Sequence, residues 1–336
     1  RLFLSARKTC VEVNGVRSDN TYLNEGLPQG SAISPLLFLI FINDITNGLA
    51  NNTYPSLFAD DTAAWVIFGD NREDAVRRMQ KSIDAVEEWA KKWKMRLNVD
   101  KTEALVISSN SKDLEWKPEL KLSKKAVKIV KEYKFLGVTV DSGLRFTSHM
   151  KKVIAKGKRR NRILRCLAGK DWGQSLETQR ALYLTYIRSA MEYACASWYP
   201  WISATNKKRL EAVQNEALRS MCRLSKTCPI DFLRLESGVE PLSVRMDKSC
   251  MITWERYNRL PEEDTRKVLQ NSAVRRHGLK SRHGWRHNTG PSMEQFECNR
   301  NIPPVNIAPW MEMNAKIESV DMEKKKEEYS SEELKE

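Results

Sequence analysis

The sequence predicts an α+β fold, in which a region of antiparallel strands and helices precedes a mainly helical region. Two observations predict it. Short alternating or β-branched runs, separated by turn residues, fill the first 140 positions. Beyond Gly143, three long helical patterns follow one another without a strand pattern between them. Since 336 residues leave room for two domains, we place a domain boundary at 143/144.

The first elements are a hairpin and a helix. Residues 11–16, VEVNGV, alternate valines around Asn-Gly, the dipeptide typical of a two-residue hairpin turn. A largely buried helix is expected to start with Ser34 as its N-cap and Pro35 at its first position. Its apolar run predicts that it continues to about Leu49.

A second hairpin is predicted at residues 54–68, YPSLFADDTAAWVIF, with Asp60 and Asp61 at its turn. Residues 71–93 then form an amphipathic helix, because apolar residues recur every three or four positions behind an Asn71 cap. Further strands are expected at 103–108, 126–130 and 134–140.

The second region is predicted to contain helices at about 147–167, 176–192 and 205–223. Beyond about Arg245 the periodicity weakens, and the last residues are densely charged. We therefore divide the chain after position 143 into a helical domain (144–245), a connecting linker (246–310) and a charged, disordered tail (311–336).

The charge balance favours a polyanionic partner. Lys and Arg outnumber Asp and Glu by 57 to 43, which gives a net charge of +14. Ten basic residues and no acidic one lie between Leu144 and Lys170. Opposite an apolar stripe of the predicted helix, part of this run should face phosphates of a nucleic-acid backbone: Lys151, Lys152, Lys156, Arg159 and Arg162.

Several classes of protein are disfavoured. The seven cysteines contain no CxxC pair, which argues against a zinc ribbon or a disulfide framework and favours free thiols in an intracellular protein of the cytoplasm and nucleus. The most apolar run, residues 36–42, is far shorter than the ~20 residues of a membrane span, so no membrane association is expected.

The adjacent carboxylates of Asp60 and Asp61 repel each other unless a cation or hydrogen-bond donors compensate. Mg²⁺ fits, because it prefers carboxylate oxygens and also accepts phosphate oxygens. The alternative is that an Asp-Asp pair simply favours a turn.

Four strings around this pair stand in a specific order: GLPQGSAISPLLFLIFINDI, LFADDT, WKMRLNVDKTEALVIS and YKFLGVTVD. In this order and spacing the chain resembles reverse transcriptases, most closely those of non-LTR retrotransposons of the jockey and LINE type, over about Arg1 to Arg245. The resemblance implies a partial polymerase palm at 1–143 and a thumb at 144–245. It also implies two Mg²⁺ ions, an RNA template, a DNA primer and deoxynucleotides (dNTPs).

The resemblance also implies roles for single residues. Asp60 matches the metal-binding aspartate of the palm hairpin, and Asp61 is the second member of that motif. Lys101 resembles a lysine near the pyrophosphate, although a solvated loop residue is the alternative. The loop that approaches nucleotide and template corresponds to Pro28, Gln29, Gly30 and Ser31, and the primer grip to Phe135, Leu136 and Gly137. For Phe135 and Leu136, core packing is an equally good account.

The resemblance fails at one point. The family's first catalytic aspartate is expected upstream of the PQG element, and nothing before Leu27 matches it; most of the fingers is missing as well. We therefore expect the chain by itself to be inactive. The alternative function is a non-catalytic, nucleic-acid-binding remnant of a retroelement. Group II intron proteins, viral RNA-dependent RNA polymerases and telomerase-like enzymes are less favoured polymerases.

Aromatic and histidine clusters receive more ordinary interpretations. Trp198, Tyr199 and Trp201 are expected to pack between helices instead of stacking on bases. The three histidines of residues 276–287, RHGLKSRHGWRH, are interpreted as part of a basic linker, because no cysteine pair completes a metal finger.

Overall fold

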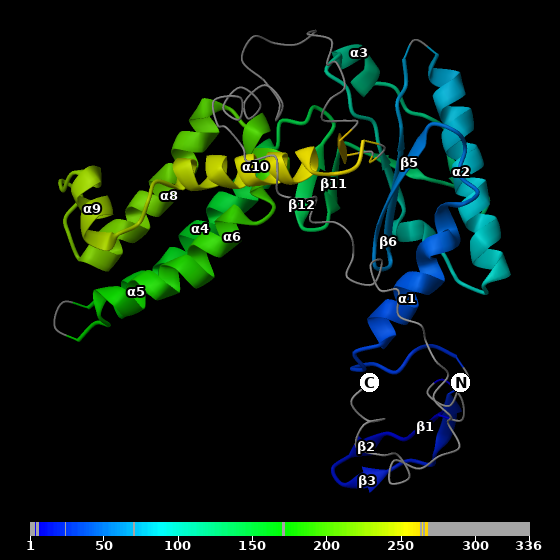
Figure 1. The fold of residues 1–336 in the computed structure, drawn as a ribbon, viewed down its shortest axis with the longest axis horizontal. Helices are drawn as coiled ribbons and strands as arrows, with labels where there is room; N and C mark the ends of the chain where they lie inside the picture. The colour runs from blue at the N-terminus through cyan, green and yellow to red at the C-terminus, as the bar shows by residue number, and fades with distance from the viewer. Residues whose placement is uncertain are drawn as a thin grey trace, which may run out of the picture. The chain divides into compact units, whose positions relative to one another are not determined.

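The computed structural model describes residues 4, 7–23, 25–69, 71–169, 172–262, 264 and 266–267. The backbone forms two compact units, unit 1 (Arg1–Leu144) and unit 2 (Arg145–Glu336), which are described separately (Figure 1). Unit 1 combines strand pairs with helices and the described part of unit 2 is helical, so the predicted α+β class is confirmed. The predicted tail at 311–336, the three histidines and most of the predicted linker at 246–310 lie outside the described residues.

Unit 1 begins with two short antiparallel strand pairs: β1 (Arg7–Thr9) with β4 (Thr21–Leu23), and β2 (Glu12–Val13) with β3 (Val16–Arg17). The turn between β2 and β3 is formed by Asn14 and Gly15, both with positive φ (+52° and +80°). Two successive positive φ values define the type I′ turn that Asn-Gly favours. The predicted first hairpin is therefore confirmed.

Helix α1 (Ser34–Ile42) continues into a 3₁₀ turn, η1 (Asn43–Thr46). Ser34 is not its N-cap as predicted. That position belongs to Ile33, which makes no side-chain cap. Ser34 lies inside the helix, and its hydroxyl donates to the carbonyl oxygen of Pro28 at 2.6 Å. The hydroxyl thereby ties the helix to the loop that precedes it.

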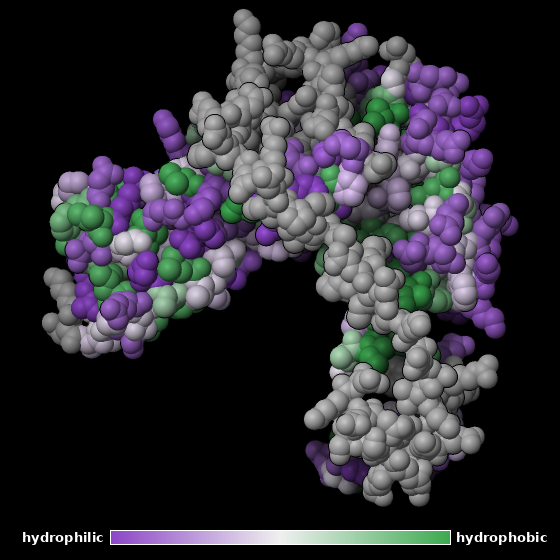
Figure 2. All heavy atoms as spheres, in the orientation of Figure 1, coloured by the Kyte–Doolittle hydropathy of each residue, from purple (hydrophilic) through white to green (hydrophobic). Residues whose placement is uncertain are grey.

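The prediction that α1 is largely buried is wrong. Leu36, Leu39 and Ile40 are 52%, 52% and 66% exposed, and hydrophobic side chains lie at the surface over α1 (green, Figure 2). The apolar residues of this helix surround it on all sides, so that packing along one side leaves others in solvent. Its Phe41 makes edge contacts to Trp89 and Trp93, at centroid distances of 5.7 and 5.2 Å.

A hairpin of β5 (Thr53–Phe58) and β6 (Asp61–Val66) follows, and α2 (Arg72–Lys92) packs against both strands. The Asn71 side chain accepts from the backbone N–H of Asp74 at 3.0 Å, which confirms the predicted cap. On another side, α2 contributes partly buried Val76, Met79 and Ile83 to a small core cluster of Leu120, Leu122 and Val127.

The remaining elements of unit 1 are short: η2 (Val99–Lys101), β7 (Glu103–Leu105), α3 (Ser111–Leu114), β8 (Lys121–Leu122), β9 (Lys125–Ala126), β10 (Lys128–Val130), β11 (Glu132–Phe135) and β12 (Val138–Asp141). β7 pairs parallel to β10, whereas β8–β9 and β11–β12 are antiparallel. The single strand expected at 134–140 is instead a hairpin. Its turn residues Leu136 and Gly137 have φ of +45° and +85°, which no extended strand permits.

Unit 2 contains α4 (Thr147–Leu167), α5 (Leu176–Leu182), the π-helical segment η3 (Tyr183–Arg188), α6 (Ser189–Glu192), α7 (Cys195–Trp198), η4 (Tyr199–Trp201), α8 (Ala204–Cys222), α9 (Ile230–Ser237) and α10 (Leu242–Asn258). The helices predicted at 147–167, 176–192 and 205–223 are confirmed within one residue at each end, although a π segment interrupts the second. α10 crosses position 245/246, where the sequence placed the start of the linker. None of the described helices is long and apolar enough to cross a membrane.

The core of unit 2 is dense where α4 meets α8. A Cβ atom on Gly157 would lie 2.9 Å from Val213 and 3.0 Å from the sulfur of Met191, so the glycine permits close approach of the helices. One turn later, the buried Asn161 amide donates to the carbonyl oxygen of Val213 at 2.9 Å. Trp198 is fully buried, in agreement with its interpretation as core.

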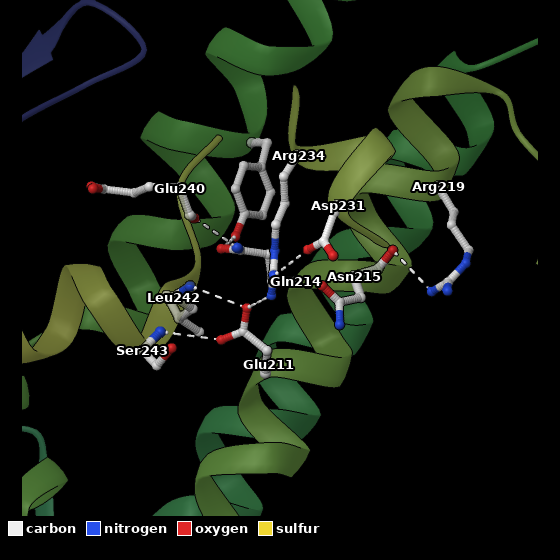
Figure 3. A network of polar contacts seen from close by, with 10 residues as sticks. Glu211, Gln214, Asn215, Arg219, Asp231, Arg234, Glu240, Leu242 and Ser243 are labelled. Atoms are coloured by element: carbon white, nitrogen blue, oxygen red, sulfur yellow. Dashed lines mark hydrogen bonds and ion pairs between the residues drawn. The ribbon is translucent and has the colours of Figure 1, made fainter. Parts of the chain in front are cut away.

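A polar network joins α8 to α9 and α10 (Figure 3). The Glu211 carboxylate accepts from the backbone N–H groups of Leu242 and Ser243, at 3.3 and 3.1 Å, and from Arg234 at 2.9 Å. It thereby satisfies the otherwise unpaired N–H groups at the start of α10. Unit 2 is thus fixed by hydrogen bonds as well as by apolar packing.

Candidate functional site

The acidic pair lies at the tip of the β5–β6 hairpin. Because Phe58 pairs with Asp61, the turn consists of two residues, Ala59 and Asp60. Ala59 has φ +51°, a left-handed conformation that costs a residue with a side chain ~1–2 kcal/mol. Asp60 therefore occupies the turn itself, and Asp61 is the first residue of β6.

Both carboxylates are exposed. Within the part of the chain that the structure describes, no hydrogen bond or ion pair engages either of them. Exposure to water explains how two adjacent like charges are tolerated here, since solvent screens their repulsion. It also leaves their oxygens accessible to a ligand.

The strands behind the turn hold it in place. Tyr54 and Trp65 are direct cross-strand partners, and their rings stack at a centroid distance of 6.1 Å. Arg78 of α2 donates to the carbonyl oxygen of Ile67, just beyond β6, at 3.1 Å. The hairpin is thus connected to α2 by a polar contact as well as by packing.

The donor set at the turn fits Mg²⁺ in one specific way. Across the described residues, no group of three or more His, Cys, Asp or Glu side chains is placed to enclose a metal ion. Two adjacent, accessible carboxylates instead suit the mode in which Mg²⁺ takes one or two protein oxygens and completes its shell with water and substrate phosphate.

The PQG loop precedes α1. Gln29 and Gly30 are exposed, whereas Pro28 and Ser31 are partly buried. Gly30 has φ +85°, and no heavy atom lies within 4 Å of the position of a Cβ. The backbone conformation therefore requires the glycine, while the space above it is open. The Ser31 hydroxyl accepts from the N–H of Ile33 at 3.3 Å, which steadies the loop.

Lys101 ends η2 and is exposed. Its backbone N–H donates to the Asn98 side chain at 3.1 Å, so the backbone of the turn is capped. No hydrogen bond, ion pair or ring contact joins Gln29 or Lys101 to the acidic pair in the described region. The structure therefore places these residues on separate exposed turns of unit 1.

The predicted primer-grip residues surround the β11–β12 turn. Phe135 is the last residue of β11, and Leu136 and Gly137 form the turn. Phe135 and Leu136 are partly buried, and Gly137 is exposed. Both earlier interpretations, packing and primer contact, are compatible with side chains in this half-buried position.

The basic residues of α4 share its exposed face. Val153, Gly157, Asn161 and Leu164 are buried on the side that meets other helices. The residues predicted to face phosphates are all exposed: Lys151, Lys152, Lys156, Arg159 and Arg162. These five residues are called the basic face below. Helical periodicity thus separates the packing side of α4 from a positive surface.

Sequence reasoning missed two local features of these sites. The strain at Ala59 has no sequence signal, because a φ above zero is ordinarily signalled by Gly or Asn. The exposed ring of Tyr186, which lies under the guanidinium of Arg160 at 4.0 Å, was also missed. Tyr186 lies within the π segment η3, which a search for 3.6-residue periodicity does not detect.

The chain is similar in sequence to known proteins. The family model described as reverse transcriptase (RNA-dependent DNA polymerase) matches residues 2–140, which include the acidic hairpin, the PQG loop and Lys101. The RNA-directed DNA polymerase from mobile element jockey of Drosophila funebris is 27% identical over 225 residues, covering 65% of this chain and 24% of that protein.

Two further relatives are similar. The probable RNA-directed DNA polymerase from transposon BS of Drosophila melanogaster is 26% identical over 230 residues, or 65% of this chain and 24% of that protein. The retrovirus-related Pol polyprotein from type-1 retrotransposable element R1 2 of Nasonia vitripennis is 27% identical over 227 residues, which cover 64% of this chain and 54% of that protein. The chain spans about a quarter of the length of the first two relatives. Residues 2–140 therefore match the reverse transcriptase family, and the proteins that the chain resembles include RNA-directed DNA polymerases named from mobile elements and transposons.

Proposed function

We propose that this chain supplies part of the palm and the thumb of an RNA-directed DNA polymerase, which adds dNTPs to the 3′-hydroxyl of a DNA primer on an RNA template. One observation carries the proposal. Inside the segment that matches the reverse transcriptase family, Asp60 and Asp61 stand exposed at the tip of a two-residue hairpin turn, with no protein partner among the described residues.

In this proposal Asp60 and Asp61 hold Mg²⁺, with Asp60 as the principal ligand. Bound there, two Mg²⁺ ions supply activation of the primer 3′-hydroxyl and neutralisation of the leaving pyrophosphate. The Lys101 ammonium adds a positive charge for the pyrophosphate. Gln29 contacts the incoming nucleotide and template from the loop that Pro28, Gly30 and Ser31 shape.

Two further surfaces hold the nucleic acid. Phe135, Leu136 and Gly137 position the primer end from the β11–β12 turn. The basic face of α4 contacts phosphates independently of sequence, as a polymerase that must move along its template requires. On this basis we propose residues 1–143 as the palm and residues 144–245 as the thumb.

The 336-residue chain by itself is proposed to be inactive. Its acidic hairpin offers two adjacent carboxylates, and no third His, Cys, Asp or Glu joins them within the described residues. A pair of Mg²⁺ ions acting together in nucleotidyl transfer would need a further protein ligand. The alternative, a nucleic-acid-binding remnant, is favoured by one observation: the basic face is exposed and requires no metal.

Primer extension tests the proposal in a chimaera in which this chain replaces the matching segment of the jockey polymerase. Asp60→Asn should abolish extension on an RNA template while duplex affinity stays within about twofold, because the hairpin carries the metal and not the phosphate contacts. Asp19→Asn, at another exposed position of unit 1, is the matched control and should remain active.

The outcomes separate the two functions. Extension by Asp60→Asn at the rate of the parent chimaera would exclude the polymerase assignment of this residue. A chimaera that binds duplex with a steep salt dependence but extends nothing would favour the remnant. Reversal of charge at Lys152, Arg159 and Arg162 should weaken binding under either function, and unchanged affinity would exclude the basic face as the contact surface.

A further inference from the structure

The helix that packs against α4 contains an unusual segment. α5, η3 and α6 run without a break from Leu176 to Glu192, and η3 (Tyr183–Arg188) is π-helical. Such segments are rare and occur frequently at functional sites. Here the inner side of η3 is fully buried at Tyr183 and Ile187, while the Tyr186 side chain is 40% exposed.

Tyr186 is fixed by Arg160 of α4. The Arg160 guanidinium carbon lies 4.0 Å from the centroid of the Tyr186 ring, and a guanidinium N–H donates to the Tyr186 carbonyl oxygen. Two interactions with the same residue hold the cation against the ring. Lys156 and Arg159 of the basic face are on the same stretch of α4.

From Ala181 to Tyr193 the exposed positions of this helix carry no charge, whereas Glu177 and Arg180 are exposed in the turns before them. Ala181, Thr185, Ser189 and Tyr193 follow one another at intervals of four residues, and all are exposed. The hydroxyl of Thr185 donates to the carbonyl oxygen of Ala181 at 2.7 Å, and that of Ser189 donates to Thr185. The hydroxyls are thus directed to the backbone of their own helix, and the surface offers small side chains and two aromatic rings.

The acidic residue between Ala181 and Tyr193 is engaged by arginines. Glu192 is paired with Arg188 at 3.1 Å and lies 3.5 Å from Arg245, and its side chain is 18% exposed. A phosphate chain on the basic face would therefore meet no free carboxylate along the row from Ala181 to Tyr193. Next to a positive helix, an uncharged row with an exposed ring suits a nucleobase.

We propose that Tyr186, backed by Arg160, is a stacking platform for an unpaired nucleobase of a strand whose phosphates lie on the basic face of α4. The inference rests on the proposed function, because the basic face must first hold the strand. Stacking on a tyrosine ring tolerates any base, in keeping with a surface that reads no sequence. Arg160 restrains the ring and adds a cation beside the base.

The test compares a short DNA duplex carrying a single-stranded tail with the same duplex made blunt, using fluorescence anisotropy and the 336-residue chain. Tyr186→Ala should weaken binding of the tailed duplex about 5- to 150-fold and leave the blunt duplex within about twofold. Tyr186→Phe keeps the ring and should bind like the parent chain. Thr185→Ala, one position earlier on the same exposed side, is the matched control.

A second measurement distinguishes stacking from a loss of folding. In the parent chain, an abasic nucleotide at one position of the tail should reduce affinity by the same factor as Tyr186→Ala, and should reduce it no further in that variant. The salt dependence of binding should stay unchanged in Tyr186→Ala, because no phosphate contact is removed. Thermal unfolding should show both variants folded.

Opposite results have distinct meanings. If charge reversal on the basic face weakens binding but Tyr186→Ala binds the tailed duplex like the parent chain, the platform is excluded and the proposed function stands. Equal losses on tailed and blunt duplexes would also exclude it. If charge reversal changes nothing, the basic face itself fails, and with it the proposed thumb contact.

Discussion

The acidic hairpin of unit 1 and the basic helix of unit 2 differ in how much buried apolar packing lies behind their charged residues. Among the described residues, all of the largest fully buried side chains belong to unit 2, among them Trp198, Tyr183 and Leu164. In unit 1, Phe58 at the end of β5 and Ile67 just beyond β6 are 62% and 61% exposed. The small cluster around Leu120, Leu122 and Val127 supplies much of its core.

The difference shows two ways to expose a charged site. On α4, the residues between the cations are buried against other helices, so packing fixes the charged face. At the hairpin, the turn geometry and the contact with α2 position the carboxylates, with less apolar burial behind them. Since hydrophobic stabilisation grows with the apolar area removed from water, we expect unit 2 to be the more resistant to unfolding.

The largest effect should come from a large-to-small substitution in the core of unit 2. Trp198→Ala removes a fully buried ring that also donates to the Tyr193 carbonyl oxygen at 3.0 Å, and should cost about 3–5 kcal/mol. Trp65→Ala in β6, where the ring is 40% exposed and stacks on Tyr54, should cost about 1 kcal/mol. Denaturant unfolding, followed by hydrogen exchange in each unit, measures both losses of stability. Equal losses would contradict the expectation that the core of unit 2 contributes more to stability than the hairpin of unit 1.

An intermediate effect is expected where α4 approaches α8. Gly157→Leu places atoms where Val213 and Met191 already lie and should cost about 1–3 kcal/mol through overpacking. Ala155→Leu, on the exposed side of the same helix, should change stability by less than about 0.5 kcal/mol. A lower denaturation midpoint for Gly157→Leu, with hydrogen exchange in unit 1 unchanged, would show that the loss of stability is confined to unit 2. A tolerated leucine at 157 would show that the interface is loose.

The smallest effect concerns pH. Burial of the His149 imidazole, and then the charge of Lys152, hold the pKa of His149 below its usual value. Above pH about 6.5 the His149 ring is neutral in both the folded and the unfolded chain, so it does not change the free energy of unfolding. As the pH falls below this value, the unfolded chain takes up the proton first, and unit 2 loses stability until the pH has passed the lower pKa of the folded state.

His149→Phe is the matched variant for this effect. The rings of His149 and Trp198 meet edge to face at a centroid distance of 5.2 Å, and a phenyl ring can keep this contact but cannot titrate. The melting temperature of the variant should fall less than that of the parent chain as the pH drops below about 6.5. The same pH dependence in both proteins would assign the loss to other groups.

Much of the local structure was predictable. The alternating valines around Asn-Gly, the Asn71 cap of α2 and the bounds of α4 all depend on residues within a few positions of one another. The hairpin with its acidic turn was predicted for the same reason. Burial of α1 was predicted wrongly, because an apolar run shows that a helix could be buried and does not show what covers it.

The sequence by itself determined which residues carry charge, where the chain turns and which helices form, since these depend on side chains, φ preferences and hydrogen bonds between near neighbours. Only the tertiary structure decided which faces are buried, that Arg160 lies over Tyr186 and that Glu211 caps α10 from 31 residues away. Such contacts join segments remote along the chain, and their partners are selected by packing between helices, for which no local pattern is a guide.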